Sequence, residues 1–468
     1  MIPKKVLAEK FLVSALHTLK DTNVILTWIE EMKKNVKVHI ELTSFSKLKN
    51  WKFASNQMQL QHTSGGFFSI QGLGVKTNWG DINNWKQPII NQPEVGILGV
   101  ISKEIDGVLH FLLQAKIEPG NINDVQLSPT LQATKSNFTQ VHGGAKPHYL
   151  DYFTSEAKCV LIDQLQSEQG SRFLKKRNRN IIILVESEIP ILDNFIWLTL
   201  AEIHKLIELP NVINMDTRTV FSSVFYSDID NEKLEKTYFP KLSRLGQAIL
   251  LSSCKIETGP FSFEELLSWL TELKTKYELS LSQISLNEMT DWIIEDNEIR
   301  RFDERFFKVI PINIQINNRE VATWDQPMIL PMNDGICGFL IKIESDIMYF
   351  LVQAKLECGN HDIIELAPTV QCLTGSYIND TPPKFLNYFI DARKNDVIYD
   401  VYQSEEGGRF FQEQNRNMIV QVDENFTFDD PHYRWMTIGQ LKKFLLFNNY
   451  LNIQSRSLIS AISFSWKN

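Results

Sequence analysis

The sequence predicts an α+β protein built from two tandem copies of one unit, each with a mixed β-sheet. The first observation is a repeat: FLLQAKIEPGN, from Phe111 to Asn121, returns as FLVQAKLECGN, from Phe350 to Asn360, with eight of eleven positions identical. A period this long indicates a duplicated domain and not a solenoid. The second observation is that β-branched segments alternate with segments of helical spacing, which favours layers of helix and sheet.

The repeat continues at nearly the same offset through most of the chain. Matching pairs outside the first one are Trp85-x-Gln-Pro and Trp324-x-Gln-Pro, Gln-Ser-Glu-x-Gly-x-Arg-Phe at Gln166 and Gln403, Asn-Arg-Asn at Asn178 and Asn415, and Trp197-x-Thr and Trp435-x-Thr. We expect residues 1–226 to form the first repeat with its N-terminal helix. Residues 227–260 are expected to be an inter-repeat linker without counterpart in the first copy, and residues 261–468 the second repeat.

Each element follows from the local pattern. Residues 1–20 lack the sustained apolar core and cleavage site of a signal peptide, so they predict an amphipathic helix. Helical spacing predicts further helices, and β-branched runs flanked by turn residues predict strands. The expected helices are Val24–Lys34, Leu200–Leu209, Leu242–Leu251, Phe263–Tyr277 and Ile438–Phe447, and the expected strands of the first repeat are Phe67–Val75, Gly96–Ser102, Val108–Ile117 and Ile181–Val185.

Composition narrows the class of protein. With 43% hydrophobic residues the chain can bury an ordinary core, and no segment approaches the ~20 apolar residues of a membrane helix. Five cysteines without CxxC spacing argue against a disulfide framework and a zinc site, and they fit a reducing cytoplasm. The net charge of −8 is spread evenly, which disfavours nucleic-acid binding but leaves room for a small anionic ligand held by a few arginines.

Polar residues alternate along one strand in both copies. Gln114, Lys116 and Glu118 share one face, and the second copy repeats the pattern at Gln353, Lys355 and Glu357. Such groups do not sit in a dry core without partners. They either line a pocket or belong to a solvated face with structural ion pairs.

The next segment is expected to be another alternating stretch in the first repeat. Its polar residues are Gln126, Ser128, Thr130, Gln132 and Thr134, and the second copy keeps Thr369 and Gln371. After it the copies diverge, and the first alone carries a histidine, His142, which titrates near neutrality and suits proton transfer. A structural role for His142 stays open.

Arginines and tryptophans mark a possible binding surface for a nucleotide. Arginine forks suit phosphate oxygens, although a structural ion pair with a nearby carboxylate is an equal alternative. The arginines are Arg172 and Arg179 in one unit and Arg409 and Arg416 in the other. Trp85 and Trp324 either stack on a base or pack in the core. No dinucleotide fingerprint, phosphate loop, HExxH or GxSxG motif is present in the sequence.

Taken together, QAKIEPGN, VQLSPTLQAT, SNFTQVHGG and QSEQGSRF, with QAKLECGN, ELAPTVQC and QSEEGGRF in the second half, resemble the NDP-hexose 2,3-dehydratases. The resemblance covers nearly the whole chain. It implies a homodimer whose subunits each contain two Nudix-like α/β/α units, acting without metal or cofactor on a dTDP-4-keto-6-deoxyhexose in deoxysugar biosynthesis. The glycine-led, Glu-rich box of Nudix hydrolases is absent from both halves, which disfavours pyrophosphate hydrolysis. The diketone product implies coupling to an NADPH-dependent 3-ketoreductase.

Residue chemistry then suggests roles, which the resemblance does not fix. Glu118 is the expected base at carbon 3, Lys116 the donor to the enolate oxygen, and His142 the acid for the departing hydroxyl. The other expected substrate contacts are Gln114, Gln126, Ser128, Gln132, Thr134, Asn137, Asn178 and Trp85, with Arg172 and Arg179 on the diphosphate. A second nucleotide-sugar site is expected at Lys355, Glu357, Glu365, Gln371, Tyr377, Arg409, Arg416 and Trp324.

Other functions remain open from the sequence. A non-catalytic nucleotide-sugar binding protein would use the same pockets, and a Nudix-type nucleoside diphosphate hydrolase would require magnesium. A purely structural dimer would leave the matched polar strand faces without a purpose.

Overall fold

The computed structural model describes residues 2–54, 59–135, 146–155, 158–257, 259–317, 321–377 and 381–466. Two residues expected at the site, Asn137 and His142, therefore lie outside the described residues.

Each half contains one large sheet and one small sheet. The large sheets are mixed, because β11 runs parallel to β6 and β23 parallel to β18, while their other pairings are antiparallel. The duplicated, mixed α+β architecture is thus confirmed, whereas a second sheet in each half was not predicted. The first large sheet contains β6 (Gly96–Ile105), β7 (Val108–Ile117), β8 (Val125–Ser128), β9 (Leu131–Ala133), β10 (Cys159–Ser167), β11 (Arg177–Leu184) and β12 (Phe195–Leu198). The second contains β18 (Gly335–Glu344), β19 (Ile347–Leu356), β20 (Ile364–Ala367), β21 (Val370–Leu373), β22 (Val397–Ser404), β23 (Gln414–Gln421) and β24 (Tyr433–Met436).

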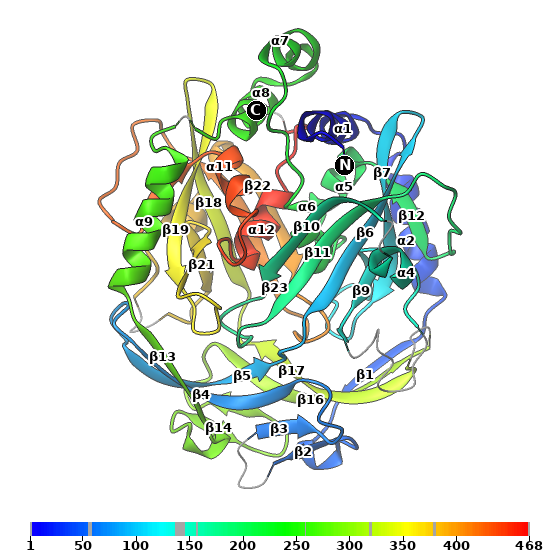
Figure 1. The fold of residues 1–468 in the computed structure, drawn as a ribbon. Helices are drawn as coiled ribbons and strands as arrows, with labels where there is room; N and C mark the ends of the chain where they lie inside the picture. The colour runs from blue at the N-terminus through cyan, green and yellow to red at the C-terminus, as the bar shows by residue number, and fades with distance from the viewer. Residues whose placement is uncertain are drawn as a thin grey trace.

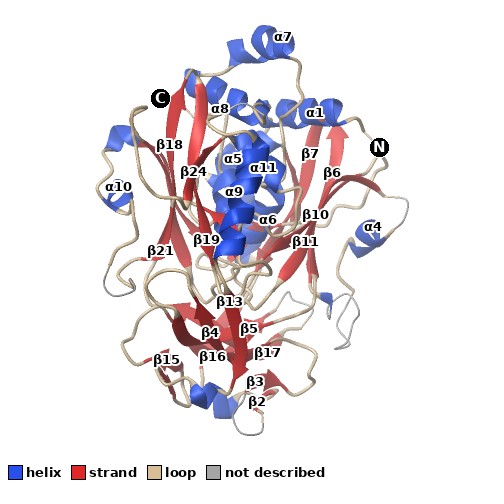
Figure 2. Ribbon diagram, turned by 60° about the vertical axis from the view of Figure 1, so that its left-hand side comes forward, coloured by secondary structure: helices blue, strands red, loops and turns tan. Residues whose placement is uncertain are grey.

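Helices fill the space between the two large sheets (Figure 2). They are α5 (Leu200–Ile207), α6 (Met215–Phe221), α11 (Ile438–Phe444) and α12 (Ile453–Ser460). The sequence starts α5 and α11 in the same way: Thr199 and Thr437 each form a capping box with the residue three positions on. The box gives partners to N–H groups of the first turn that have none within the helix. Their apolar side chains join one core cluster with both sheets. Short helices α4 (Leu150–Thr154) and α10 (Asn387–Ile390) flank the outer faces.

Two further helices lie along the top of the molecule in Figure 1, α1 (Lys4–Leu16) and α8 (Arg244–Cys254). They make equivalent contacts. Ser14 Oγ donates to the Leu109 carbonyl at 2.6 Å, and Ser252 Oγ donates to the Met348 carbonyl at 2.5 Å. The helix expected within residues 242–251 is therefore the structural counterpart of α1, although no sequence match had indicated it. The rest of this region forms α7 (Asn231–Lys233) and two short turns, Leu234–Tyr238 and Phe239–Lys241.

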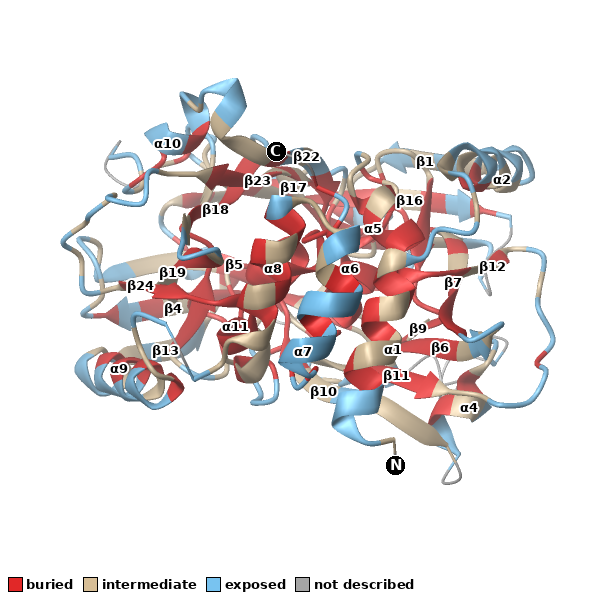
Figure 3. Cartoon of the chain, turned by 90° about the horizontal axis from the view of Figure 1, so that it is seen from above, coloured by how far each residue is buried: buried red, intermediate tan, exposed pale blue. Residues whose placement is uncertain are grey.

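The small sheets exchange one strand between the halves. β13 (Leu279–Ile284) of the second half pairs with β4 of the first, and β1 (Val38–Leu42) of the first half pairs with β16 of the second. Each exchanged strand follows an exposed helix, α2 (Thr22–Lys34) or α9 (Phe263–Lys276), and these two helices lie at opposite ends of the molecule in Figure 3. The other strands are β2 (Trp51–Phe53), β3 (Gln59–His62), β4 (Ser69–Thr77) and β5 (Asn84–Asn91) in one sheet and β14 (Trp292–Ile294), β15 (Ile299–Arg301), β16 (Phe307–Ile316) and β17 (Thr323–Pro331) in the other.

The expected elements are confirmed closely where local patterning is strong. The expected strand Val108–Ile117 coincides with β7, and the helices α2, α5, α9 and α11 start within two residues of their expected positions. Among the described helices, none combines the length and apolar character needed to cross a bilayer.

Candidate active site

The site opens where β6 and β7 separate. These strands pair only between Ile101–Ile105 and Val108–Leu112; beyond that point β9 pairs with β6 and β8 pairs with β7. Residues 125–134 are therefore two strands, and the expectation of one alternating stretch is wrong. The chain switches partners at Pro129, which has no N–H for a ladder, and the Thr130 hydroxyl joins the parted strands by accepting from the Ile101 N–H at 3.0 Å and donating to the Leu112 carbonyl.

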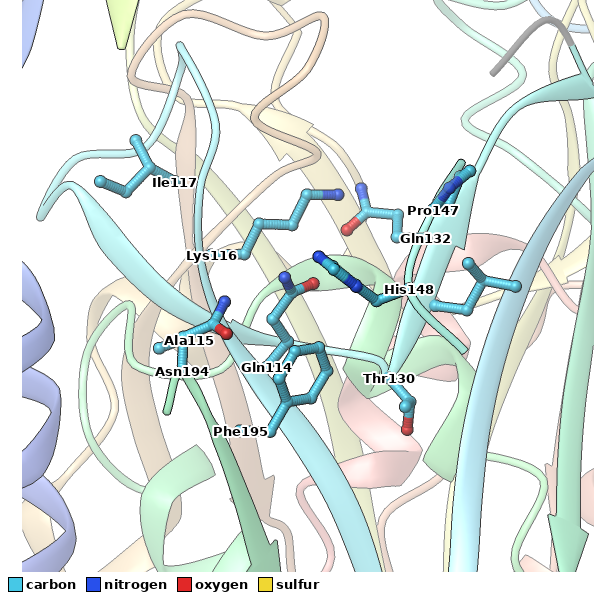
Figure 4. Close-up of a pocket in the computed structure, with 11 residues that line it drawn as sticks. Gln114, Ala115, Lys116, Ile117, Thr130, Gln132, Pro147, His148, Asn194 and Phe195 are labelled. Atoms are coloured by element: carbon cyan, nitrogen blue, oxygen red, sulfur yellow. The ribbon is translucent and has the colours of Figure 1, made fainter. Parts of the chain in front are cut away.

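The polar ends of several side chains converge in the gap between β6 and β7. Figure 4 shows Gln114, Lys116, Gln132 and His148 turned toward one another, with Ile117 pointing away. They line a cavity of about 50 Å³. The alternation expected along β7 is confirmed here, because the apolar neighbours Leu113, Ala115 and Ile117 are buried on the opposite face.

A larger cavity of about 460 Å³ adjoins Lys116 and Gln132. Its volume is within the range of small-molecule sites. Both repeats contribute to its wall. The first repeat supplies Trp51, Phe68, Lys116, Glu118, Gln132, Thr134, Glu168, Lys176, Asn178 and Asp216, and the second supplies Trp324, Asp325, Gln326, Glu406, Gly408 and Arg409.

Glu118 is held by two neighbours on the cavity wall. Its Oε1 accepts a hydrogen bond from Gln132 Nε2 at 2.8 Å, and Lys116 Nζ lies 3.9 Å from the same oxygen. Gln132 is fixed in turn by Asn214, the residue that caps α6, whose Nδ2 donates to Gln132 Oε1 at 3.3 Å. The side chains of Lys116 and Glu118 are only 12% and 6% exposed, so the sheet and a helix start together orient this carboxylate.

Four further carboxyl groups share the cavity: Glu168, Asp216, Asp325 and Glu406. Burial, with the nearby charge of Glu118, raises the pKa of Glu406 to about 7, although Arg409 opposes this shift. Burial also raises the pKa of Asp216 well above its usual range, and Glu168, Glu406 and Glu118 add to the effect. The charges of these carboxyls act on one another, so their ionisation is coupled.

Two cations balance this acidic group. Arg409 stacks over the Phe68 ring with its guanidinium carbon 4.1 Å from the centroid, and Lys176 donates to the Glu94 carbonyl. Burial lowers the pKa of both side chains, and carboxylates including Glu406 for Arg409 and Glu168 for Lys176 counteract it. A planar arginine and a lysine at one cavity suit an anionic ligand such as a diphosphate.

Glycines let the second repeat reach the first repeat's cavity. The Gly120 N–H donates to the Gly407 carbonyl at 2.7 Å, and a Cβ on Gly407 would lie 3.0 Å from the Glu118 Cβ. The same contact recurs in the other direction, from the Gly359 N–H to the Gly170 carbonyl at 2.7 Å. The glycine of the Gln-Ser-Glu-x-Gly-x-Arg-Phe motif therefore docks one repeat against the glutamate loop of the other.

This crossing exchanges the arginines and tryptophans between the sites. Arg409 and Trp324, expected at the second site, line the first cavity. Arg172, expected in the first, instead stacks over Phe307 of the second repeat at 4.1 Å, and Trp85 packs beside Cys358. The structure thus does not bring Arg172 or Trp85 together with Lys116 and Glu118, because each motif loop crosses to the opposite repeat.

The remaining expected residues divide into two groups. Thr134 and Asn178 line the cavity, and Asn178 Nδ2 donates to Glu168 Oε1 at 2.7 Å. Gln126 and Ser128 are buried away from it: Gln126 Oε1 accepts from Ser404 Oγ at 2.9 Å, and Ser128 Oγ contacts backbone carbonyls. Arg179 and Arg416 form partly exposed bidentate pairs with Asp163 and Asp400. Their contacts are thus the structural ion pairs given above as the alternative to phosphate binding.

The second repeat carries an equivalent but altered constellation. Gln371 Nε2 donates to Glu357 Oε1 at 3.1 Å, and Lys355 Nζ donates to the Gln371 carbonyl at 2.9 Å. Glu365 accepts from Ser167 Oγ at 2.7 Å, and burial raises its pKa to about 7. The Tyr377 carbonyl accepts from Arg305 at 3.2 Å. At the positions that match Glu406, Asp216 and Lys176, the chain has Gln169, Gln454 and Glu413. Gln169 belongs to the first repeat, on the loop whose Gly170 lies against Glu357 and Asn360.

Among the ionisable residues that line the two cavities, those that the sequence did not single out include His148, Glu168, Lys176, Asp216 and Glu406. Aligning the copies would have revealed three of them by difference, since Lys176, Asp216 and Glu406 each change charge between the repeats. Residues shared by the copies led to Lys116 and Glu118, and the difference considered between the copies was His142.

Fold and cavity together define a duplicated α+β protein with a composite acid–base site sized for a small anionic ligand. Comparison with known proteins specifies the family. The family model for NDP-hexose 2,3-dehydratase matches residues 22–224 and again 263–462. The chain belongs to this family, so it is an enzyme of the hydro-lyase class, as its motifs had implied.

Three similar proteins are each named dTDP-4-dehydro-6-deoxy-alpha-D-glucopyranose 2,3-dehydratase. The one from Saccharopolyspora spinosa is 42% identical over 461 residues, which cover 97% of this chain and 94% of that protein. The one from Amycolatopsis orientalis is 37% identical over 94% of this chain and 90% of its own length. The one from Streptomyces violaceoruber is 36% identical over 95% of this chain and 97% of its own length.

Proposed function

We propose that this chain eliminates water across carbons 2 and 3 of dTDP-4-dehydro-6-deoxyglucose, and that the cavity at Lys116 and Glu118 is the working site. The names of three relatives that match nearly the full chain support the substrate. The observation that carries the site is the oriented carboxylate: Glu118 accepts from Gln132 at 2.8 Å and lies 3.9 Å from Lys116, on the wall of a 460 Å³ cavity.

The chemistry follows from the ketone at carbon 4 of the substrate. This carbonyl acidifies the hydrogen on carbon 3, which Glu118 removes, while Lys116 stabilises the charge that develops on the enolate oxygen. The enolate expels the 2-hydroxyl, and the resulting enol relaxes to a 3,4-diketone. A positioned base typically contributes ~10² to 10⁴ in rate, and one donor to a developing oxyanion ~3 kcal/mol. The substrate brings its own activating carbonyl, so the proposed reaction requires no cofactor.

The nucleotide half of the substrate is assigned to residues of both repeats. Arg409 and Lys176 hold the diphosphate, in place of Arg172 and Arg179, and Trp324 offers a ring for the base. Thr134, Asn178 and Gln132 face the sugar. His142 stays a sequence-based candidate for the acid. The constellation at Lys355, Glu357, Glu365, Gln371 and Tyr377, completed by Arg172 and Trp85, is proposed to take a second nucleotide sugar.

The proposal extends to the setting of the enzyme. Each large sheet with its helices is proposed to be a Nudix-like unit, on the resemblance of the motifs and the mixed sheet of each half. Subunits are proposed to pair as homodimers in the cytoplasm. The reactive diketone is proposed to pass to an NADPH-dependent 3-ketoreductase.

A coupled assay tests the function. Purified protein, dTDP-4-dehydro-6-deoxyglucose and a 3-ketoreductase with NADPH should give a dehydrated, reduced sugar nucleotide by mass spectrometry. Substrate that binds but keeps its water would support a binding protein, and magnesium-dependent release of dTMP would support a hydrolase. Glu118→Gln should lower turnover ~10²-fold or more with dTDP affinity unchanged. Glu357→Gln, its counterpart, is the matched control and should leave most turnover intact.

A further inference from the structure

Two carboxyl groups distinguish the first cavity from the matching constellation of the second repeat. Glu406 and Asp216 line the cavity, whereas the chain has Gln169 and Gln454 at the equivalent positions. Gln169 matches Glu406 in shape and keeps hydrogen-bonding atoms, but an amide neither takes up nor releases a proton near neutral pH. The difference between the two sites is therefore one of proton transfer more than of shape.

Glu406 and Glu118 face the same point from opposite repeats. A Cβ on Gly408 would lie 2.3 Å from Glu406 Oε1 and 3.6 Å from Glu118 Oε1. Glu406 is fixed in this position by the Gly408 N–H, which donates to its Oε1 at 3.0 Å. Both carboxyls therefore lie against Gly408, and all three residues line the cavity.

The surroundings of the two carboxyls differ. Glu118 receives the Gln132 amide and has the Lys116 ammonium 3.9 Å away, and both stabilise a carboxylate. Glu406 is near Glu118 and Glu168, with Arg409 as the opposing cation, and burial together with Glu118 raises its pKa to about 7. Two carboxyls in unlike environments at one cavity are typical of paired acid and base roles.

We propose that Glu406, contributed by the second repeat to the first repeat's cavity, is the catalytic acid that protonates the departing 2-hydroxyl. The inference rests on the proposed function, and it places the base and the acid on different repeats. It also accounts for placing the chemistry in the first cavity: the constellation with Gln169 keeps a glutamate and a lysine but has no carboxyl at the position of Glu406.

The proposed step balances in atoms and protons. Glu118 takes the proton from carbon 3, and the electron pair of that C–H bond forms the enolate, with a double bond between carbons 3 and 4 and the charge on oxygen 4. When the carbonyl at carbon 4 re-forms, this electron pair makes the carbon 2–carbon 3 double bond and the C2–O bond breaks. Glu406 gives its proton to the leaving oxygen, which departs as water. The enol then loses the proton on oxygen 3 and gains one at carbon 2, and two proton transfers restore both carboxyls. Substrate becomes diketone plus one water, without oxidation or reduction.

Glu406→Gln is the direct test, because the chain already places glutamine at the matching position 169. Turnover should fall ~10² to 10⁴-fold, while dTDP affinity stays unchanged. In D₂O this variant should still exchange the hydrogen on carbon 3, since the base step is intact. Glu118→Gln should lose that exchange.

A substrate analogue with fluorine at carbon 2 separates the acid from a structural role. Fluoride departs with less need for a proton, so Glu406→Gln should release fluoride within about tenfold of the unmodified enzyme, whereas Glu118→Gln should not. His142→Gln is compared in parallel. If the fluorinated analogue restores turnover to His142→Gln and not to Glu406→Gln, the inference is overturned. Normal dehydration by Glu406→Gln, or the absence of exchange at carbon 3 in that variant, would overturn it as well. Failure of the unmodified enzyme to dehydrate substrate would instead reject the proposed function.

Discussion

Gly120→Ala should disable the enzyme by separating the two repeats at the active site. A Cβ at this position would lie 1.7 Å from the Phe410 carbonyl oxygen and 2.9 Å from that of Gly407. Ordinary contacts require more than 3 Å, so the loop that carries Glu406 and Arg409 must withdraw by over 1 Å. Overpacking of this kind costs about 1 to 3 kcal/mol, and loss of the Gly120–Gly407 hydrogen bond adds about 1 kcal/mol.

The chain supplies a matched control at Gly359, where a Cβ would lie 1.8 Å from the Phe173 carbonyl oxygen. Gly359→Ala should cost the same stability in denaturant unfolding as Gly120→Ala. Turnover should differ, because displacement of about 1 Å at reacting groups costs on the order of 10²-fold in rate. The coupled reductase assay should show that loss in Gly120→Ala, with Gly359→Ala retaining most activity.

Two results would refute this reasoning. Equal losses of turnover in both variants would show that turnover depends on both glycine contacts and not on the first cavity alone. Unchanged unfolding midpoints in both would show that the backbone contact between the glycine loops is not as close as described.

Two further predictions concern single charges. Arg409→Lys keeps the charge but loses the guanidinium fork and the stacking on Phe68, so dTDP affinity measured by calorimetry should fall about tenfold. Arg179→Lys, at a partly exposed pair with Asp163, is the control and should leave dTDP affinity unchanged. Equal effects of the two substitutions would contradict the assignment of Arg409 to the diphosphate. Burial raises the pKa of Glu413 to about 8, above its ordinary 4.5, so folding stability is lost as pH rises between these values. Glu413→Gln should therefore gain up to a few kcal/mol over the unmodified protein between about pH 5 and pH 8 in denaturant unfolding, and a pH-independent difference would contradict the shift.

Local patterns determined much of the fold. The period-two alternation of β7 placed Lys116 on one face and buried Ala115 and Ile117 on the other, because side-chain direction in a strand depends on its immediate neighbours. The capped helices α5 and α11 began where helical spacing indicated. The break at Pro129 was not predicted. Polar and apolar residues keep alternating across it, whereas the strand that pairs with this segment changes from β7 to β6.

The sequence by itself determined the duplication, the main elements, the family and the strand that carries Lys116 and Glu118. Only the tertiary structure decided which repeat completes which site: β1 and β13 are exchanged, and Arg409, Trp324 and Glu406 cross to the first cavity. The physical reason is that the two copies carry nearly the same motifs. The residues of a motif loop therefore do not indicate which repeat that loop contacts. The choice between them depends on contacts such as Gly120 with Gly407, which join residues far apart in the chain and form only when the halves pack together.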